Sequence, residues 1–361
     1  MSVIRNDIIK VKKTNIELIK SALKAHPEST KAQIAALTGI SVVTCGKILN
    51  ELKKTGEVLE GAHINTGCGR PATTFRFNAN YASVACLFLW SDRGRLELVS
   101  EIADLIGQVI FSEVTALHVI DYNVLEQKVD LLLRKQPSIQ AIAIGVPGTV
   151  HNGVISSSYL LPLNGMALQE KLSAAFPHVQ IMVESAARAA AYGYSLSENI
   201  TSEDICAYFF IPTSVRTGRS PHEILTPATP LSESESKTKP LLIDVGLVCD
   251  HKIIRGASGL AGSMGLFLPP DLYGEIPAEV IANLFSMLIP ILNPRTIAVT
   301  GSGLTEERLQ HVRMLCEDYL SPEYLPQLKL RPDCRQDYAN GLTLIALQML
   351  SCGIELVQKR I

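Results

Sequence analysis

The apolar residues at the start of the chain recur at the spacing of a helix. This pattern predicts helices over residues 15–25, 31–38 and 41–55. Thr30 and Ser41 stand at the starts of the second and third helices, and both residue types favour a helix N-cap. Because the turn around Gly39 between these two helices is tight, the pattern indicates a helix-turn-helix unit.

The third predicted helix has one apolar face and one face of small and polar residues. The apolar face, Cys45, Ile48, Leu49 and Leu52, is expected to pack against Ile34, Leu37 and Ile40. The opposite face presents Ser41, Val42, Val43, Thr44, Gly46, Lys47 and Asn50. Since a helix-turn-helix places the first residues of this helix against base edges, this face is the candidate DNA-binding surface.

The residue types on this face suit contacts with DNA. Thr44 can bond a base or a phosphate, and Val42 or Val43 can pack on a thymine methyl group. Lys47 is expected to contact a phosphate, which positions the protein without reading sequence. Glycine costs about 1 kcal/mol in a helix relative to alanine, so Gly46 is explained by a close approach of the backbone to DNA.

A β-wing is expected after the third helix. The run over 56–60 and the alternating residues 74–77 predict two short strands, joined through a glycine-rich run that ends in Arg70 and Pro71. Arg70 at the tip is placed to enter a neighbouring minor groove. Residues 1–80 are therefore predicted to form a winged helix-turn-helix domain.

Beyond residue 80 the pattern changes to alternating strands and helices. Strands are expected over 83–90, 96–102, 140–146, 181–184, 205–211, 241–245 and 296–300, and helices over 123–135, 186–196 and near Ala278. This alternation predicts an α/β fold with mixed sheets over residues 81–361. Residues 216–240, rich in Ser, Thr and Pro, are expected to form a long, mobile loop.

Charge separates the two parts of the chain. Residues 1–80 hold twelve Lys and Arg against six Asp and Glu, whereas the whole chain has a net charge of −2. A basic head on an acidic body suits a head that binds nucleic acid. The cysteines form no CxxC pair, the histidines lack metal-ligand spacing, and no secretory or membrane-spanning segment is evident. We therefore expect a reduced, cytoplasmic protein without metal, cofactor or membrane partner.

Residues 143–150, 183–191, 254–262 and 292–301 carry motifs in an order that resembles the ROK family of repressors and sugar kinases. The Gly-Ala-Ser-Gly-Leu-Ala-Gly run that ends at Gly262 is the most specific of them. The resemblance implies a two-lobed, actin-like (ribonuclease H-like) sugar-kinase fold for the body. It also implies that the Gly-Arg-Pro wing belongs to a head of the kind found in the family's transcription regulators.

The chain departs from the family at the positions that its kinases use. The resemblance places the catalytic base at Ala186, which cannot accept a proton, and a sugar contact at Tyr159. The family's Gly-Glu-Ile-Gly-His motif reads Gly262-Ser263-Met264-Gly265-Leu266, without the sugar-binding Glu or the zinc-binding His. The resemblance therefore implies no catalytic residue and no kinase activity.

The phosphate-binding loops depart as well. The first reads Asp92-Arg93-Gly94-Arg95-Leu96, with side chains where the family has bare glycine backbone. The second aligns with residues 211–215, where Pro212 removes a backbone donor. Only Gly301-Ser302-Gly303 still resembles a loop on the nucleotide side.

The leading hypothesis is a DNA-binding transcription regulator, a repressor in the first instance, that acts as a homodimer or homotetramer on a palindromic or A·T-rich site. Its kinase-like body would bind a sugar or sugar-phosphate effector in a cleft lined by Tyr159, Asn164, Glu184 and Ser263. Two alternatives stay open: a DNA-bound scaffold without a ligand, and an atypical kinase that uses Glu184, Asp244 or Asp250.

Overall fold

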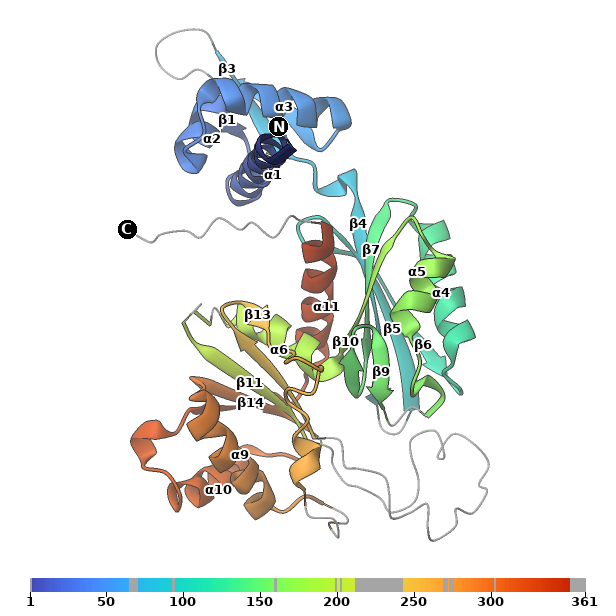
Figure 1. The fold of residues 1–361 in the computed structure, drawn as a ribbon, viewed down its shortest axis with the longest axis vertical. Helices are drawn as coiled ribbons and strands as arrows, with labels where there is room; N and C mark the ends of the chain where they lie inside the picture. The colour runs from blue at the N-terminus through green and yellow to red at the C-terminus, as the bar shows by residue number, and fades with distance from the viewer. Residues whose placement is uncertain are drawn as a thin grey trace.

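The protein consists of a small head and two α/β lobes (Figure 1). The computed structural model describes residues 2–64, 71–92, 95–158, 161–198, 200–201, 203–211, 243–268, 272, 275–301 and 303–350. The mobile loop predicted over 216–240 lies outside the described residues.

The head combines three helices with a small antiparallel sheet. The helices are α1 (Ser2–Ala25), α2 (Lys31–Thr38) and α3 (Val42–Thr55), and the sheet has the order β1 (Ser29–Thr30), β3 (Ala72–Phe77), β2 (Val58–Ile64). Both predicted N-caps are confirmed, because the Thr30 side chain accepts from the Gln33 amide and that of Ser41 from the Thr44 amide. The helix predicted to begin at residue 15 begins at Ser2 instead.

The core of the head confirms most of the predicted packing. Cys45, Ile48, Leu49 and Leu52 of α3 are buried with Ile19, Leu23, Ile34, Val58 and Phe75, and Ile40 packs at the edge. The prediction for Leu37 is wrong, because this side chain is 43% exposed. Ile34 and Ala35 supply the buried face of α2, and the chain turns away at Gly39 (φ +71°) before any element could cover Leu37.

The two lobes are built on sheets of the same topology. In lobe 1 the strand order is β10 (Gln180–Ser185), β7 (Ile139–Val146), β4 (Ser83–Asp92), β5 (Arg95–Asp104), β6 (Val109–Leu117). In lobe 2 it is β13 (Lys252–Ile253), β12 (Asp244–Cys249), β11 (Ile205–Phe210), β14 (Thr296–Thr300), β15 (Gln327–Leu330). The first strand of each lobe, β4 or β11, is central in its sheet. It pairs antiparallel with the next strand, β5 or β12, and parallel with β7 or β14.

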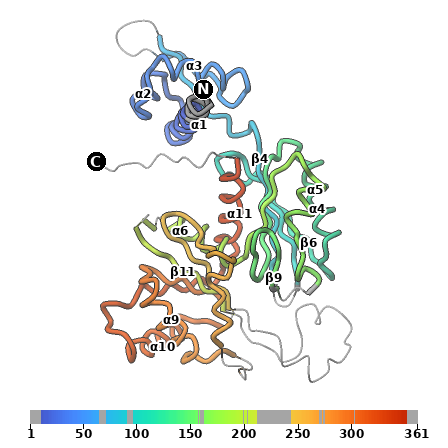
Figure 2. Tube along the Cα trace, viewed as in Figure 1, coloured from blue at the N-terminus to red at the C-terminus, as the bar shows by residue number. Residues whose placement is uncertain are grey.

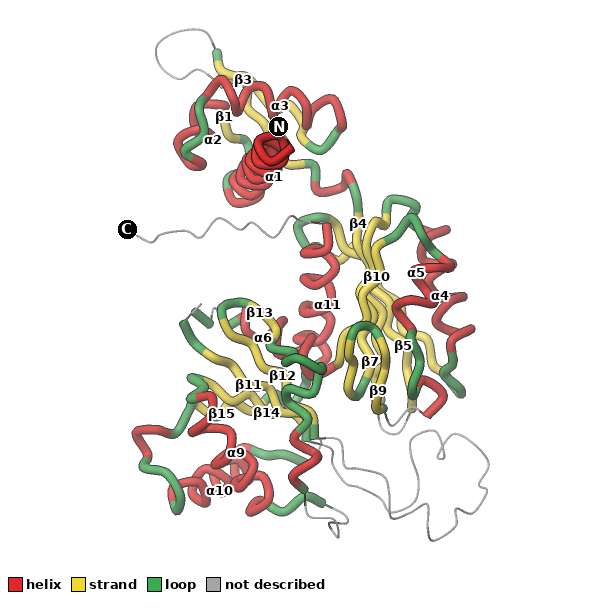
Figure 3. Tube along the Cα trace, in the orientation of Figure 1, coloured by secondary structure: helices red, strands yellow, loops and turns green. Residues whose placement is uncertain are grey.

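Helices cover both faces of each sheet. The outer face of lobe 1 packs against α4 (Tyr122–Lys135) and α5 (Leu168–Ala175), and that of lobe 2 against α9 (Ala278–Leu292) and α10 (Glu306–Glu317). Between the sheets lie α6 (Ala186–Ser197) and α11 (Arg335–Leu350), as Figure 3 shows. The short elements are η1 (Ala79–Tyr81), β8 (Thr149–His151), β9 (Val154–Ser157), η2 (Leu161–Leu163), η3 (Met264–Phe267) and η4 (Pro322–Tyr324).

Helices α6 and α11 cross at glycines. A side chain at Gly341 of α11 would overlap the carbonyl oxygen of Ala189, and one at Gly193 of α6 would overlap that of Asp337. The two backbones therefore touch directly, and the crossing holds the shared core of both lobes.

The α/β fold with mixed sheets is confirmed, and every predicted strand and helix of the body corresponds to an element. One of them is misplaced, because the strand predicted over 241–245 runs over Asp244–Cys249. Strands β6, β8, β9, β13 and β15 and helices α5, α10 and α11 have no counterpart among the predicted elements. No single helix in the described residues is both long and apolar enough to cross a membrane.

Candidate DNA-binding surface and interlobe cleft

Helices α2 and α3 meet in the geometry of a helix-turn-helix. Their axes bend by 113° across the turn at Gly39, within the range of about 90–120° typical of that motif. At the start of α3 the Ser41 and Thr44 hydroxyls lie 2.9 Å apart, and the Ser41 oxygen also accepts from the Thr44 amide. The first turn of α3 is therefore fixed by its own side chains.

The residues of α3 and its N-cap that are predicted to contact DNA differ in exposure. Val42 and Val43 are 51% and 70% exposed. Ser41, Lys47 and Asn50 are also exposed, whereas Thr44 and Gly46 are half-buried. Within the described residues Lys47 forms no ion pair, so its charge is available to a phosphate.

Ion pairs within the head occupy three of its lysines. Lys12 pairs with Glu51 at 2.8 Å, Lys20 with Glu57 at 2.5 Å, and Lys53 with Glu60 at 2.7 Å. In the part of the head whose side chains the structure describes, the exposed cations without an ion pair are Lys13, Lys24, Lys47, Lys54 and Arg76, and Lys24 lies over the Phe77 ring at 4.8 Å. Lys13, Lys54 and Arg76 were not singled out from the sequence, because their availability depends on which neighbours pair with acids.

The structure describes the two strands of the predicted wing, β2 and β3. Strands β2 and β3 pair in antiparallel register from Val58↔Phe77 to Ile64↔Ala72, which confirms the two predicted strands and extends both. Pro71 precedes β3 and is exposed. Arg70, at the predicted tip, lies outside the described residues.

A hydrogen bond joins the end of the head to lobe 1, because the Leu105 amide at the β5–β6 turn donates to the Ala79 carbonyl at 3.0 Å. Within the head, the Asn78 side chain donates to the Gly56 carbonyl at 2.8 Å and holds this end of the head against the end of α3. The chain then enters β4 of lobe 1, as Figure 2 shows. A displacement of lobe 1 relative to lobe 2 would therefore carry the head with it.

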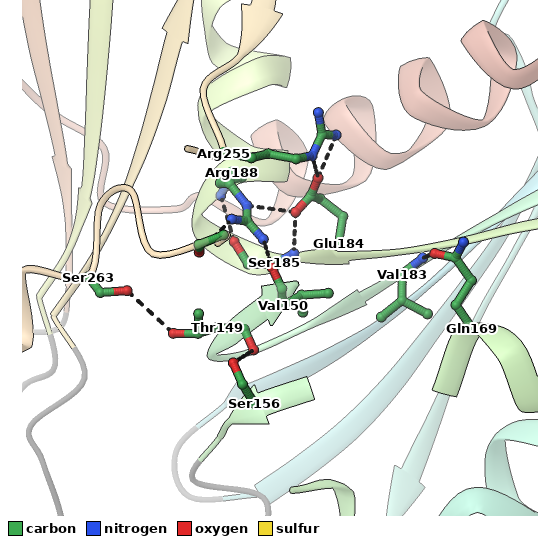
Figure 4. A network of polar contacts seen from close by, with 11 residues as sticks. Thr149, Val150, Ser156, Gln169, Val183, Glu184, Ser185, Arg188, Arg255 and Ser263 are labelled. Carbon is green, nitrogen blue, oxygen red and sulfur yellow. Dashed lines mark hydrogen bonds and ion pairs between the residues drawn. The ribbon is translucent and has the colours of Figure 1, made fainter. Parts of the chain in front are cut away.

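Where the two lobes meet, at the position of the predicted ligand cleft, buried Glu184 accepts bonds from two arginines (Figure 4). This carboxylate, at the end of β10, is 1% exposed. It accepts from Arg188 Nε at 2.7 Å, from Arg255 Nε at 2.9 Å and from the Ser185 amide at 2.8 Å. Glu184 is thus a fold-stabilising ion-pair partner, with its oxygens already used.

The other residues predicted to line a ligand cleft do not join Glu184. The Ser263 hydroxyl lies 3.4 Å from that of Thr149, across the lobes. Asn164 is exposed in the loop after η2, where its side-chain oxygen accepts from the Ser158 amide at 2.6 Å. Tyr159 lies outside the described residues.

The two remaining acids considered for catalysis differ in their surroundings. Asp250 is exposed and pairs with Lys252 at 2.6 Å, which lowers the pKa of the Asp250 carboxyl. Asp244 is not the exposed loop acid that the sequence suggested, because it begins β12. Burial raises the pKa of Asp244 to about 6, against a weaker opposing effect of Arg188.

The structure describes some of the kinase positions that the sequence singled out. Ala186, where the resemblance places the base, is the first residue of α6. Strands β4 and β5 pair as far as Asp92↔Arg95, so two residues join them where the family has a phosphate loop. No three His, Cys, Asp or Glu residues of the described chain are placed to hold a metal ion.

Comparison with known proteins identifies the architecture. The chain matches no protein-family model and no curated protein. Among solved structures it resembles a ROK-family transcriptional regulator, a homologue of the E. coli MLC protein, with a TM-score of 0.65 and 16% identity, over 93% of this chain and 96% of that one.

Two kinases resemble about three quarters of the chain. A putative N-acetylmannosamine kinase from Listeria monocytogenes aligns with a TM-score of 0.56 and 14% identity, over 74% of this chain and all of that one. The ROK hexokinase from Thermus thermophilus aligns with a TM-score of 0.54 and 16% identity, over 74% of this chain and 99% of that one. The chain therefore has the fold of a ROK-type protein, with a body shared by regulators and sugar kinases and a head that extends the match to a regulator.

Proposed function

We propose that this protein is a cytoplasmic, DNA-binding transcription regulator of the ROK type that represses its targets as a homodimer or homotetramer. The observation that carries the proposal is the exposed, N-capped face of α3 beside a two-stranded wing. The likeness to a regulator over 93% of the chain supports it, because the kinases match only 74% of the chain. A symmetric oligomer would place two heads on the half-sites of one palindromic operator.

We further propose that the body has no kinase activity. The chain carries Ala186 at the base position and a two-residue connection in place of the first phosphate loop. Phosphoryl transfer depends on positioned phosphates and a positioned nucleophile, so both departures support the proposal. Incubation of the purified protein with ATP and a panel of hexoses tests this point, and sugar phosphorylation would contradict it.

A sugar or sugar-phosphate effector is the competing proposal for the body. It draws support from a ROK-family protein of Streptococcus pneumoniae that was solved in complex with sucrose and whose fold this chain shares at a TM-score of 0.51. The cleft contacts of Glu184 favour the alternative of a body without a small-molecule ligand.

Selection of binding sites from a random double-stranded DNA library tests the regulator proposal. We expect one two-fold symmetric site, and we expect Lys47→Ala and Arg70→Ala each to weaken binding and to reduce the salt slope by about one unit. Lys252→Ala, which changes a lysine paired with Asp250 on lobe 2, is the matched control and should bind like the parent. No sequence preference, or equal binding by all variants, would overturn the proposal.

Gly46→Ala separates helix stability from DNA contact. The nearest heavy atom to an added methyl group is Lys31 Cδ at 3.8 Å, so the side chain fits and should stabilise α3 by up to about 1 kcal/mol. If the backbone of α3 approaches DNA closely at this position, the same change weakens binding to the selected site by about tenfold. Thermal unfolding and DNA titration of one preparation check both, and unchanged affinity would show that Gly46 is remote from DNA.

A further inference from the structure

One buried arginine joins the two lobes at the cleft. Arg188, on the first turn of α6, is 3% exposed. Its guanidinium donates to the Val150 carbonyl of β8 in lobe 1 at 2.5 Å and to the Gly259 carbonyl at 3.1 Å. Gly259 belongs to lobe 2, because the segment that follows β13 is bonded back to β12 through Ile254 and Gly262.

The same segment of lobe 2 makes two more contacts with lobe 1. Arg255 donates to Glu184 of β10 from Nε at 2.9 Å and from a terminal nitrogen at 2.7 Å. The Ser263 and Thr149 hydroxyls lie 3.4 Å apart. The segment 255–263 therefore contacts lobe 1 at both of its ends, and Arg188 binds it in the middle at Gly259 (Figure 4).

The two lobes also touch through their backbones at this place. A Cβ atom on Gly259 would lie 2.8 Å from the Val150 carbonyl oxygen and 2.9 Å from Cβ of His151. Gly259 has a φ of +71°, so a side chain here is excluded by conformation as well as by space. Between Val150 and Gly259 there is no room for a small molecule.

The contacts of Arg188 use all three nitrogens of its guanidinium. Nε donates to Glu184, and the two terminal nitrogens donate to carbonyls of opposite lobes. The buried charge is thus paired and hydrogen-bonded, which is the condition for tolerating it in the interior. An effector that entered here would have to displace these bonds and leave the Arg188 charge without its partners.

A second attachment lies further along α6. There the backbones of α6 and α11 touch at Gly193 and Gly341, within the core that the lobes share. Two attachments at different positions of one helix oppose rotation of the lobes about it, whereas the crossing alone would leave it free to act as a pivot.

We propose that Arg188 is a built-in substitute for a cleft ligand, which holds the two lobes closed without any small molecule. The body then presents the attached head in one fixed arrangement. The inference concerns the body alone, so it stands or falls independently of DNA binding.

The distance between the lobes tests this inference. Spin labels at Ala174→Cys in α5 and Gln310→Cys in α10, both exposed, report it in a full-length background of Cys68→Ser, Cys249→Ser and Cys352→Ser. We expect a single narrow distance distribution that millimolar glucose, sucrose, N-acetylmannosamine or glucose 6-phosphate leaves unchanged. A broad distribution, or a shift with any of these sugars, would overturn the proposal.

Single substitutions test whether Arg188 is what holds the lobes closed. Arg188→Ala should broaden or shift the distribution, whereas Arg134→Ala, a 77% exposed arginine on α4, should not. Arg255→Ala removes one bridge from a half-exposed side chain and keeps the buried pair, so it should fold and broaden the distribution less. If Arg188→Ala does not fold, the distance distribution of Arg255→Ala tests the proposal instead. An Arg255→Ala distribution identical to that of the parent protein would contradict it.

Discussion

Glu184→Gln is expected to lower the free energy of unfolding by about 3–5 kcal/mol at neutral pH. The change keeps the size of the side chain and removes only its negative charge. Arg188, which is 3% exposed, would then hold an uncompensated charge in the interior. The amide group of glutamine would also bring a donor to a place where two guanidinium groups and the Ser185 amide already donate.

Urea denaturation of the full chain measures this loss. Glu317→Gln is the matched control, because Glu317 is 41% exposed and pairs loosely with Arg313 at 3.7 Å, which predicts an effect within about 0.5 kcal/mol. The double variant Glu184→Gln/Arg188→Met should recover part of the loss, since the buried charge is removed together with its partner. A loss below about 1 kcal/mol for Glu184→Gln alone would show that water reaches Arg188.

The head could be predicted from the sequence because its signals are local. The caps at Thr30 and Ser41 act on amides three residues away, and the apolar face of α3 repeats within one helix. Leu37 was assigned to the core by the same spacing and is exposed, because α2 ends one residue later. Whether an apolar residue at a helix end is covered depends on elements from other parts of the chain.

The body was predicted less completely because its order comes from distant pairings. Strand β13 has two residues and β15 has four, too short to show alternation, although β15 completes the sheet beside β14. The equivalence of the two lobes is visible only in the strand order, which no local pattern encodes.

The contacts around Glu184 could likewise be predicted only where they are local in the sequence. Glu184 and Arg188 are four residues apart, a spacing that could have suggested an ion pair. Their contacts with Arg255 and Gly259 span 71 residues each and have no sequence signal. The sequence therefore placed Glu184 at the cleft without showing that its oxygens are occupied.

Asp244→Asn is expected to stabilise the protein by about 3 kcal/mol at pH 8 and to have little effect near pH 4. Burial raises the pKa of Asp244 from its usual 3.8 to about 6, so the folded chain binds this proton more tightly than the unfolded chain does. A shift of about two pKa units corresponds to about 3 kcal/mol. The ionised Asp244 carboxylate therefore lowers the free energy of unfolding by its full amount above about pH 6. This loss disappears below the pKa that Asp244 has in the unfolded chain.

The unfolding free energy of parent and variant, measured between pH 4 and pH 8, checks this sign. The advantage of Asp244→Asn should grow from about pH 4 to about pH 6 and then stay constant, because asparagine has no charge to remove from water. Asp250→Asn is the control of opposite sign, since Lys252 lowers the pKa of Asp250 and the variant loses that attraction. An Asp244→Asn variant that is less stable than the parent at pH 8 would mean that the ionised carboxylate is paired in the fold, and that Arg188 is shared between Glu184 and Asp244.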